Sequence, residues 1–326
     1  MSNKKRILII DGLNIFITNW IVNPTISENS GQPIGGVVGF IKILQKYIKS
    51  TKCSKVFVCW DSSKGSVRRK QIYKEYKENR KPIIKLNRFS KNMDESEVSD
   101  NKEKQQLRLI SYLNEMPVSQ FVEDGVEADD LIAYLCKTES LKDYDKVILS
   151  SDKDFYQLCD NSTIIVRPTQ KEIHNKNTIK DKYKISPENF ALARSIVGDS
   201  SDNIEGILGA GLKTIAKRFP FLIEDKKYFI NNIIDYINRS EKQFKLFDQI
   251  KDNKDKLVLN FKITSLYPVQ ISFDSIQKIE NKIKVEKIFL NVSKLRTMMM
   301  ADGFESINWD GLFVNLRRIV LENEKR

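Results

Sequence analysis

Three short apolar runs, each ending in or just before an aspartate, constrain the fold of this chain most strongly. They are RILIIDG at 6–12, KVFVCWD at 55–61 and KVILSSD at 146–152. Each is predicted to be a buried strand, and TIIV at 163–166 a fourth. Helical patterns separate the strands at 36–49, 103–114 and 127–137. This alternation predicts an α/β fold with a central, mainly parallel sheet flanked by helices.

The chain becomes mainly helical after about residue 185. SPENFALARSIVG at 186–198 opens with Ser-Pro, a good start for a helix. Residues 225–265 are polar and predicted to be rich in helix, and 283–325 are predicted to be mostly helical. Residues 85–103 are charge-rich, and we predict a mobile loop there.

The aspartates at the strand ends suggest a functional site. In open parallel sheets, ligands bind outside the carboxyl ends of the strands. If the three strands are neighbours, Asp11, Asp61 and Asp152 converge on one edge. A single aspartate there is an ordinary turn former or helix cap, but three with more acids nearby favour a site.

More acids lie at helix starts and loops. Glu127 and Asp130 share a helix face, and Asp129 lies beside them in the predicted first turn. Acids in a first turn also suit the helix dipole without any ligand. With S-D-K-D and D-S-S-D, the candidate metal ligands are Asp11, Asp61, Glu127, Asp129, Asp130, Asp152, Asp154, Asp199 and Asp202. Crowded carboxylates need cations, and two magnesium ions could activate a water and stabilise a leaving oxygen.

Residues 64–91 hold eleven Lys and Arg against two Glu, with tyrosines between them. Balanced charge would fit a solvated helix face, but this excess favours a path for single-stranded nucleic acid. The candidate contacts are Arg68, Arg69, Lys70, Tyr73, Lys74 and Tyr76.

The segment GILGAGLKT at 206–214 is a glycine turn opening a helix. Glycines let the backbone approach a phosphate, and a helix N-terminus favours an anion. The segment lacks the G-K-[ST] ending of a P-loop. Because helical patterns flank it, we expect a helix–hairpin–helix that grips a duplex backbone. The candidate contacts are Gly206, Gly209, Gly211, Lys213 and Thr214.

Composition narrows the chemistry. The formal net charge of +12 favours a polyanionic partner, although abundant Lys can also reflect an AT-rich genome. The single histidine, His174, is predicted at the surface, and its isolation argues against Ser-His-Asp and Cys-His enzymes.

Cysteine usage points to a reducing setting. The four cysteines form no C-x-x-C pair, which argues against a zinc site or a disulfide framework. Cys59 and Cys136 lie in apolar runs and are predicted to be core residues. The sequence has no secretory signal and no 18-residue apolar stretch, so we expect a soluble protein.

Six motifs occur in a fixed order between about residues 7 and 218. They are I-I-D-G, F-V-C-W-D, Y-K-E-N-R, G-V-E-A-D-D, S-S-D-K-D-F-x-Q-L and G-D-S-S-D-N-I-x-G-I-x-G-x-G-x-K-T. In this order they resemble the flap endonuclease/5′–3′ exonuclease family. That family includes the 5′-nuclease domain of bacterial DNA polymerase I and stand-alone phage enzymes called RNase H or 5′-exonuclease.

The resemblance implies a PIN-like fold with two metal clusters. The first would be held by Asp11, Asp61, Glu127, Asp129 and Asp130, and the second by Asp152, Asp154, Asp199 and Asp202. The resemblance implies that Lys77 and Arg80 contact the scissile phosphate and act with Asp152 and Asp154 in catalysis. Residues 64–105 would form a helical arch, and 186–220 a helix–three-turn–helix that holds duplex DNA.

Three regions are therefore expected: a catalytic domain at 1–185, a duplex-binding domain at 186–265, and an extension of unknown role at 266–326. Two positions depart from the family pattern. Thr18 stands where polymerase-linked members commonly have arginine, and Leu208 stands where proline is often found. The first departure puts one phosphate contact in doubt and points to the stand-alone phage group.

The expected function is a magnesium-dependent 5′-nuclease that removes RNA primers or short flaps in replication. We expect two Mg²⁺ ions, replaceable by Mn²⁺, and a monomer in bacterial or phage-infected host cytoplasm. The partners would be a DNA or RNA–DNA duplex and, by family analogy, a single-stranded-DNA-binding protein or sliding clamp.

The alternative is a non-catalytic DNA-binding protein on the same scaffold. A PIN-type ribonuclease would lack the hairpin and arch. The sequence leaves open whether the enzyme acts as an exonuclease or as a flap endonuclease, and whether it prefers RNA–DNA or DNA–DNA duplexes.

Overall fold

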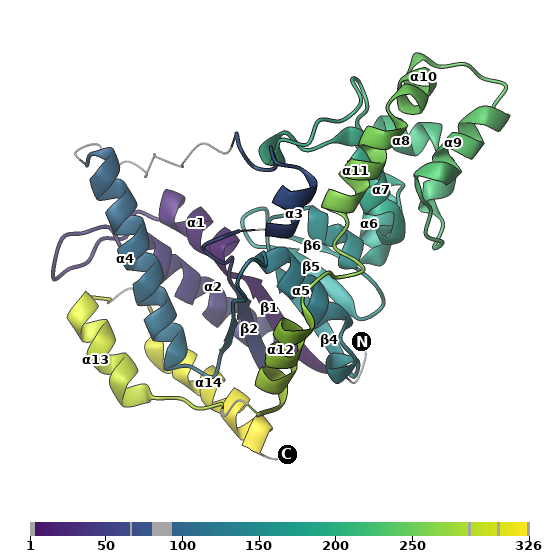
Figure 1. Ribbon diagram of the computed structural model, residues 1–326. Coiled ribbons are helices and arrows are strands. Elements are labelled where there is room, and N and C mark those ends of the chain that lie inside the picture. Colours follow the sequence, from purple (N-terminus) through teal and green to yellow (C-terminus); the bar gives the residue numbers. More distant parts are fainter. Residues whose placement is uncertain (1–3, 66, 80–92, 286–287, 305–306, 325–326) are drawn as a thin grey trace.

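The computed structural model describes residues 4–65, 67–79, 93–285, 288–304 and 307–324. A six-stranded sheet in the order β3-β2-β1-β4-β5-β6 forms its centre (Figure 1). The strands are β1 (Lys5–Asp11), β2 (Lys55–Cys59), β3 (Ser119–Phe121), β4 (Tyr144–Leu149), β5 (Thr163–Arg167) and β6 (Glu172–His174). Only the β5–β6 pair is antiparallel among these strands. The predicted mainly parallel sheet is confirmed.

Helices surround this sheet and continue beyond it. The α-helices up to β4 are α1 (Gly12–Val22), α2 (Gly35–Thr51), α3 (Val67–Ile72), α4 (Glu95–Asn114) and α5 (Ala128–Lys137). Those after β6 are α6 (Lys176–Tyr183), α7 (Pro187–Val197), α8 (Leu212–Arg218), α9 (Ile230–Arg239), α10 (Lys245–Asp252), α11 (Lys254–Thr264), α12 (Phe273–Val285), α13 (Val292–Asp302) and α14 (Trp309–Glu324). Short 3₁₀ turns are η2 (Glu139–Leu141), η3 (Asp154–Leu158), η4 (Ser200–Asp202) and η5 (Pro220–Ile223).

The two faces of the sheet lie in separate cores, because successive side chains of a strand point to opposite faces. From β1, Leu8 and Ile10 pack in one core with residues of α1, α2, α4 and α14. Ile7 and Ile9 pack in the other core with residues of α5, η3 and α7. Both faces are therefore covered, as parallel sheets require.

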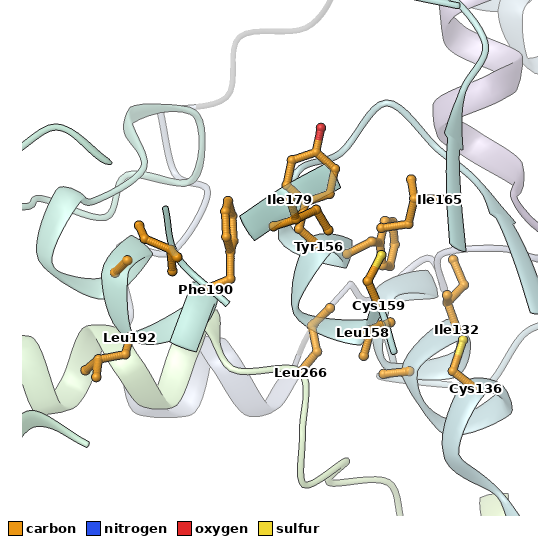
Figure 2. Close-up of a cluster of buried hydrophobic side chains, with 14 of the residues drawn as sticks. Ile132, Cys136, Tyr156, Leu158, Cys159, Ile165, Ile179, Phe190, Leu192 and Leu266 are labelled. Atoms are coloured by element: carbon orange, nitrogen blue, oxygen red, sulfur yellow. The ribbon is translucent and has the colours of Figure 1, made fainter. Parts of the chain in front are cut away.

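The second core joins the sheet to the helical region. Figure 2 shows Ile132 and Cys136 of α5 gathered with Cys159, Tyr156 and Ile165 in this core. Phe190 of α7 contacts Tyr156 edge-on, with ring centroids 5.3 Å apart. The helix α7 is thus anchored to the sheet by apolar packing.

The C-terminal segment returns to the first face of the sheet. Figure 1 shows α13 and α14 beside α2 and α4, well away from α8, α9 and α10. Leu312 and Leu316 of α14 are buried in the first core. Asn323 also donates from Nδ2 to the Ser54 carbonyl oxygen at 2.8 Å. Helices α13 and α14 therefore complete the core on this face of the sheet.

Several local predictions are corrected by the structure. His174 was predicted at the surface, but it is buried in β6 and its Nε2 lies 2.9 Å from Glu172 Oε2. The predicted loop at 85–103 is wrong after residue 94, because Asp94 and Glu97 form a capping box that starts α4. Residues 85–92 lie outside the described residues.

Other expectations are confirmed. All four cysteines are buried and unbridged, including the predicted core residues Cys59 and Cys136. The helix expected at 186–198 is α7, which has Pro187 in its first turn. Within the described ranges, no helix is both long and apolar enough to cross a membrane.

Candidate active site

The strand-end aspartates converge as predicted. Strands β2, β1 and β4 are adjacent, and Asp11 ends β1 while Asp61 and Asp152 follow β2 and β4. The start of α5 joins the same edge, because the Ala128 backbone N–H donates to Asp61 Oδ1 at 3.0 Å. Glu127 is the N-cap residue of α5.

Asp11 is buried and held from two sides. Its Oδ1 accepts from the Asn14 backbone N–H at 3.1 Å, and its Oδ2 accepts from Ser150 Oγ at 2.8 Å. Burial and the neighbouring Asp61 raise the pKa of Asp11 from its usual 3.8 to about 7. The carboxylate is thus fixed in position while its charge lacks compensation.

We use the name first acid group for Asp11, Asp61, Glu127, Asp129 and Asp130. Arg69 enters this group from α3: its guanidinium contacts Glu127 Oε2 and both Asp130 oxygens, the latter at 2.7 and 2.8 Å. Lys77 Nζ lies 2.6 Å from Glu127 Oε1. Burial opposes ionisation of Glu127, but Lys77 and Arg69 outweigh it and lower its pKa.

Asp129 has a different environment within the same group. Burial and the nearby Asp152 raise its pKa well above the usual value, although Lys77 acts in the opposite direction. Asp11 also contributes to this repulsion. Asp129 therefore belongs electrostatically with the strand-end acids, whereas both oxygens of Asp130 accept from Arg69.

We use the name second acid group for Asp152, Asp154, Asp199 and Asp202. Arg194 of α7 lies between two of these acids: Nε donates to Asp154 Oδ1 at 2.9 Å, and Nη2 donates to Asp199 Oδ2. Burial and Asp152 still raise the pKa of Asp154 to about 7. Burial likewise raises the pKa of Asp152.

The donor set fits divalent metal ions. It consists of carboxylate oxygens, the ligands that magnesium prefers, and the raised pKa values of Asp11 and Asp154 indicate missing positive charge. In the described part of the chain, no three Asp, Glu, His or Cys side chains are already arranged to hold an ion. Several oxygens instead contact Arg69, Lys77 and Arg194. Metal ligation by the nine acids stays a prediction.

Two of the side chains predicted to contact nucleic acid are buried beside the acids, and their contact with nucleic acid stays a prediction. Arg69 and Tyr76 are buried, and the Tyr76 hydroxyl lies 3.2 Å from Glu127 Oε2 and 3.3 Å from Asp202 Oδ2. Arg69 pairs with Glu127 and Asp130, and Tyr76 contacts Glu127, because the basic segment packs against these acids. Arg68 is half-buried, with Nη2 donating to the Lys262 carbonyl oxygen at 3.3 Å.

The other contacts predicted in the basic segment remain predictions. Lys70 and Lys74 are exposed, and Tyr73 is half-buried against the small cluster of Tyr76, Ile204 and Ile263. Lys77 has a left-handed backbone, with φ of 59°, and its N–H donates to the Asp202 carbonyl oxygen at 3.0 Å. Arg80 lies outside the described residues.

The glycine segment forms the expected turn between two helices. Gly198 ends α7 with φ of +80°, and a Cβ there would lie 2.3 Å from the Gly206 nitrogen. The end of α7 and the turn thus pack backbone against backbone. Gly209 also has a positive φ, and Gly211 is the N-cap residue of α8, whose first turn holds Lys213 and Thr214. Contact of this turn with nucleic acid stays a prediction.

Three residues of the site were missed in the sequence. Ser150 and Asn14 hold Asp11, and Arg194 joins Asp154 to Asp199. The lone arginine within the apolar run ALARSIV, five residues before Asp199, is the one local signal for Arg194. Ser150 opens the motif S-S-D-K-D-F-x-Q-L, but nothing in that motif assigns the serine a role.

The acids at this sheet edge, with the basic segment and the glycine turn beside them, form the arrangement that the sequence motifs predicted for a nuclease. Residues 6–184 match the family model described as 5′-3′ exonuclease, N-terminal resolvase-like domain. Since the match covers more than half of the chain, the protein belongs to the 5′–3′ exonuclease family. The resemblance seen in the sequence motifs is confirmed.

Two relatives named 5′-3′ exonuclease align with this chain over most of their length. The chain is 28% identical over 292 residues to a 5′-3′ exonuclease of Aquifex aeolicus, covering 89% of this chain and 90% of that protein. It is 29% identical over 281 residues to a 5′-3′ exonuclease of Buchnera aphidicola, covering 83% and 90%. DNA polymerase I of Bacillus subtilis is 25% identical over 286 residues, but only 30% of that longer protein is covered.

Solved structures confirm the fold. The T5 5′-exonuclease with bound divalent metal ions (zinc) gives a TM-score of 0.66 at 21% identity, covering 86% of this chain and 98% of that one. The bacteriophage T5 flap endonuclease in a complex with DNA and metal ions gives 0.63 at 20% identity, covering 98% and 100%. The predicted 5′-nuclease fold with its helical region is therefore present.

Proposed function

We propose that this nuclease hydrolyses phosphodiester bonds near the 5′ ends of nicked or branched DNA–DNA or RNA–DNA duplexes, as in primer removal. The observation that carries the proposal is the convergence of Asp11, Asp61 and Asp152 on one sheet edge. The glycine turn is connected to that edge through Lys77. The ammonium group of Lys77 contacts Glu127, and its backbone N–H donates to the carbonyl oxygen of Asp202, just before the turn. Acids for cleavage and a turn for duplex binding thus lie in one connected unit.

Two Mg²⁺ ions, with Mn²⁺ as a substitute, are the proposed cofactors. The first acid group would hold one ion and the second acid group the other. Bound ions would activate water and stabilise the leaving oxygen of the phosphodiester. The chain itself orients the ligands: Ser150 and the Asn14 backbone fix Asp11, and the Ala128 backbone fixes Asp61. Arg69 pairs with both Asp130 and Glu127 and so holds these two acids of the first group together.

Lys77 and Arg80 are the proposed phosphate contacts, acting with Asp152 and Asp154. The position of Lys77 supports its role, because its side chain is partly exposed and its Nζ lies 2.6 Å from Glu127 Oε1, at the acidic edge. An ammonium group there can donate to a phosphate oxygen and stabilise its charge.

Nucleic acid would extend from this edge in two directions. A 5′ single strand would follow Arg68, Lys70, Tyr73 and Lys74, in an arch at about 64–105, because cations and an aromatic ring suit phosphates and bases. The duplex would lie on the glycine turn, at Gly206, Gly209, Gly211, Lys213 and Thr214.

The proposed domains are 1–185 for catalysis, 186–265 for duplex binding and 266–326 as an extension of unassigned role. We further propose a cytoplasmic monomer, which could dock to a single-stranded-DNA-binding protein or sliding clamp.

Cleavage of a 5′-flap duplex labelled on the downstream strand tests the function, with magnesium and with EDTA. Nicked DNA–DNA and RNA–DNA duplexes run beside it. Metal-dependent products are expected, and their lengths separate stepwise removal from one cut near the junction. Tight binding without cleavage, in manganese as well, would contradict the proposal and indicate a non-catalytic DNA-binding protein.

A further inference from the structure

Arg194 joins two parts of the catalytic edge that are distant in the chain. Its Nε donates to Asp154 Oδ1 at 2.9 Å, and its Nη2 donates to Asp199 Oδ2. Asp154 begins η3, just after β4, whereas Asp199 follows α7. One guanidinium group therefore spans acids that separate elements bring to the site.

The contact is mostly enclosed. The Arg194 side chain is 16% exposed, and the side chains of Asp154 and Asp199 are each 18% exposed. A guanidinium group is planar and presents its donors in a fixed fork, so it sets the spacing of two acceptors. A lysine ammonium at the same position is a point charge and does not impose that spacing.

The constraint extends to neighbouring groups. The Asp154 backbone N–H donates to Asp152 Oδ1 at 2.8 Å, so the position of Asp152 depends on the segment that Arg194 holds. Arg194 Nη1 also donates to the Gly198 carbonyl oxygen at 3.3 Å. Gly198 in turn packs against the Gly206 backbone. Arg194 thus links three acids of the second group to the glycine turn.

We propose that Arg194 is a positioning residue of this nuclease. Its guanidinium sets the spacing of Asp154 and Asp199 and thereby the affinity of the second acid group for a divalent cation. The inference rests on the proposed function, in which that group binds one of two ions. The inference goes beyond the proposed function, because it names a side chain that shapes the metal site without contacting the substrate.

Direct titration with Mn²⁺, without nucleic acid, tests the proposal on the full chain and on the variants Arg194→Lys and Arg194→Gln. Free Mn²⁺ is followed by electron paramagnetic resonance. Both variants should bind one of the two ions at least about tenfold more weakly, the range found when groups supporting a metal ligand are removed. Arg108→Gln is the matched control: Arg108 pairs with Asp302 through Nε at 2.7 Å, away from the acids. It should bind as the unaltered protein does.

A second readout separates positioning from folding. The Mg²⁺ concentration for half-maximal cleavage should rise about tenfold in both Arg194 variants, while duplex affinity stays unchanged. Unchanged Mn²⁺ affinity in a folded but less stable variant would overturn the proposal, and so would full rescue by lysine. Tighter Mn²⁺ binding in Arg194→Gln would also overturn it, because it would show that Arg194 acts as a competing charge.

The outcomes distinguish this proposal from the function on which it rests. If the unaltered protein binds two Mn²⁺ ions and cleaves flaps, but the Arg194 variants match it, only the positioning role fails. If the unaltered protein neither binds Mn²⁺ nor cleaves, the proposed function fails, and the role of Arg194 fails with it. Arg194→Lys retains the positive charge beside Asp154 and Asp199, so this variant still tests the proposal if Arg194→Gln does not fold.

Discussion

The two acid groups differ in the part of the chain that supplies their positive charge. In the first group, Arg69 of α3 and Lys77 from the following turn contact Glu127. In the second group, Arg194 of α7 contacts Asp154 and Asp199. The positive charge beside the first group therefore comes from the basic segment, and that beside the second group comes from the helix that leads into the glycine turn.

This difference shows how the site depends on its surroundings. The basic segment carries a large excess of positive charge, yet Arg69 is buried and pairs with Glu127 and Asp130. Buried pairs of this kind persist because removing one partner leaves an uncompensated charge. Tyr76 lies between the groups, with its hydroxyl within hydrogen-bonding distance of both Glu127 and Asp202. The following predictions test the comparison, from the largest expected effect to the smallest.

Asp154→Asn should reduce cleavage by at least about 1,000-fold, because it removes a charged ligand from the second group. Duplex binding should be retained, since the glycine turn is unchanged. Single-turnover cleavage and duplex binding are the measurements. Asp160→Asn is the control, because Asp160 pairs with Lys137 at 2.6 Å outside both groups. Full activity of Asp154→Asn would contradict the assigned role.

Arg69→Gln should lower the free energy of unfolding by about 3–5 kcal/mol, because Glu127 and Asp130 lose their buried partner. Urea denaturation measures the change. The half-exposed pair of Arg108 with Asp302 should be worth about 1 kcal/mol or less, so Arg108→Gln serves for comparison. Equal losses in both variants would show that Arg69 has no special structural role.

The metal-free protein should become more stable as the pH falls from about 8 to about 5. Asp11 and Asp154 have pKa values of about 7 in the folded state against a usual 3.8, so the folded state binds more protons in this window. The gain should reach at least about 1 kcal/mol. Glu127 and Asp199 have lowered pKa values, so their stabilisation is lost only at more acidic pH.

Thermal unfolding across this pH range, with EDTA and with saturating Mg²⁺, measures the effect. Mg²⁺ should weaken or reverse the dependence, because a bound cation favours ionised carboxylates. A pH dependence that is identical with and without Mg²⁺ would mean that these acids do not bind the ion.

Tyr76→Phe should have the smallest effect, a loss of about 0.5–1.5 kcal/mol in the free energy of unfolding. The substitution removes one hydroxyl that lies 3.2 Å from Glu127 and 3.3 Å from Asp202. Tyr73→Phe is the control on the half-buried neighbouring ring. A drop as large as that of Arg69→Gln would show that the hydroxyl, rather than the ion pairs, joins the two groups.

The sequence was sufficient for the features that local patterns encode. Apolar runs ending at Asp11 and Asp61 predicted buried strands, because strand burial and strand ends are local properties. That these strands are neighbours was only a condition in the sequence, and the order of the sheet meets it. Strands β3 and β6 are three residues long, too short for a periodic signal, and missing β6 led to the wrong position for His174. The capping box of Asp94 and Glu97 that starts α4 lies within the charge-rich segment 85–103, whose composition favoured a loop.

The partners of the acids could not be predicted, because they depend on tertiary contacts. Arg69 and Tyr76 resemble other members of the basic segment until the fold buries them. Arg194 lies 40 residues from Asp154 in the chain. Net charge predicts a polyanionic partner, but it does not show which cations already pair with acids.

The number of Mn²⁺ ions bound by the metal-free protein tests the two-group site most directly. We predict two ions for the unaltered protein and one for Asp154→Asn, because that variant disrupts only the second group. Flap cleavage should require both ions. Fewer than two ions on the unaltered protein, or two ions retained by Asp154→Asn, would contradict the assignment of a separate cation to each acid group.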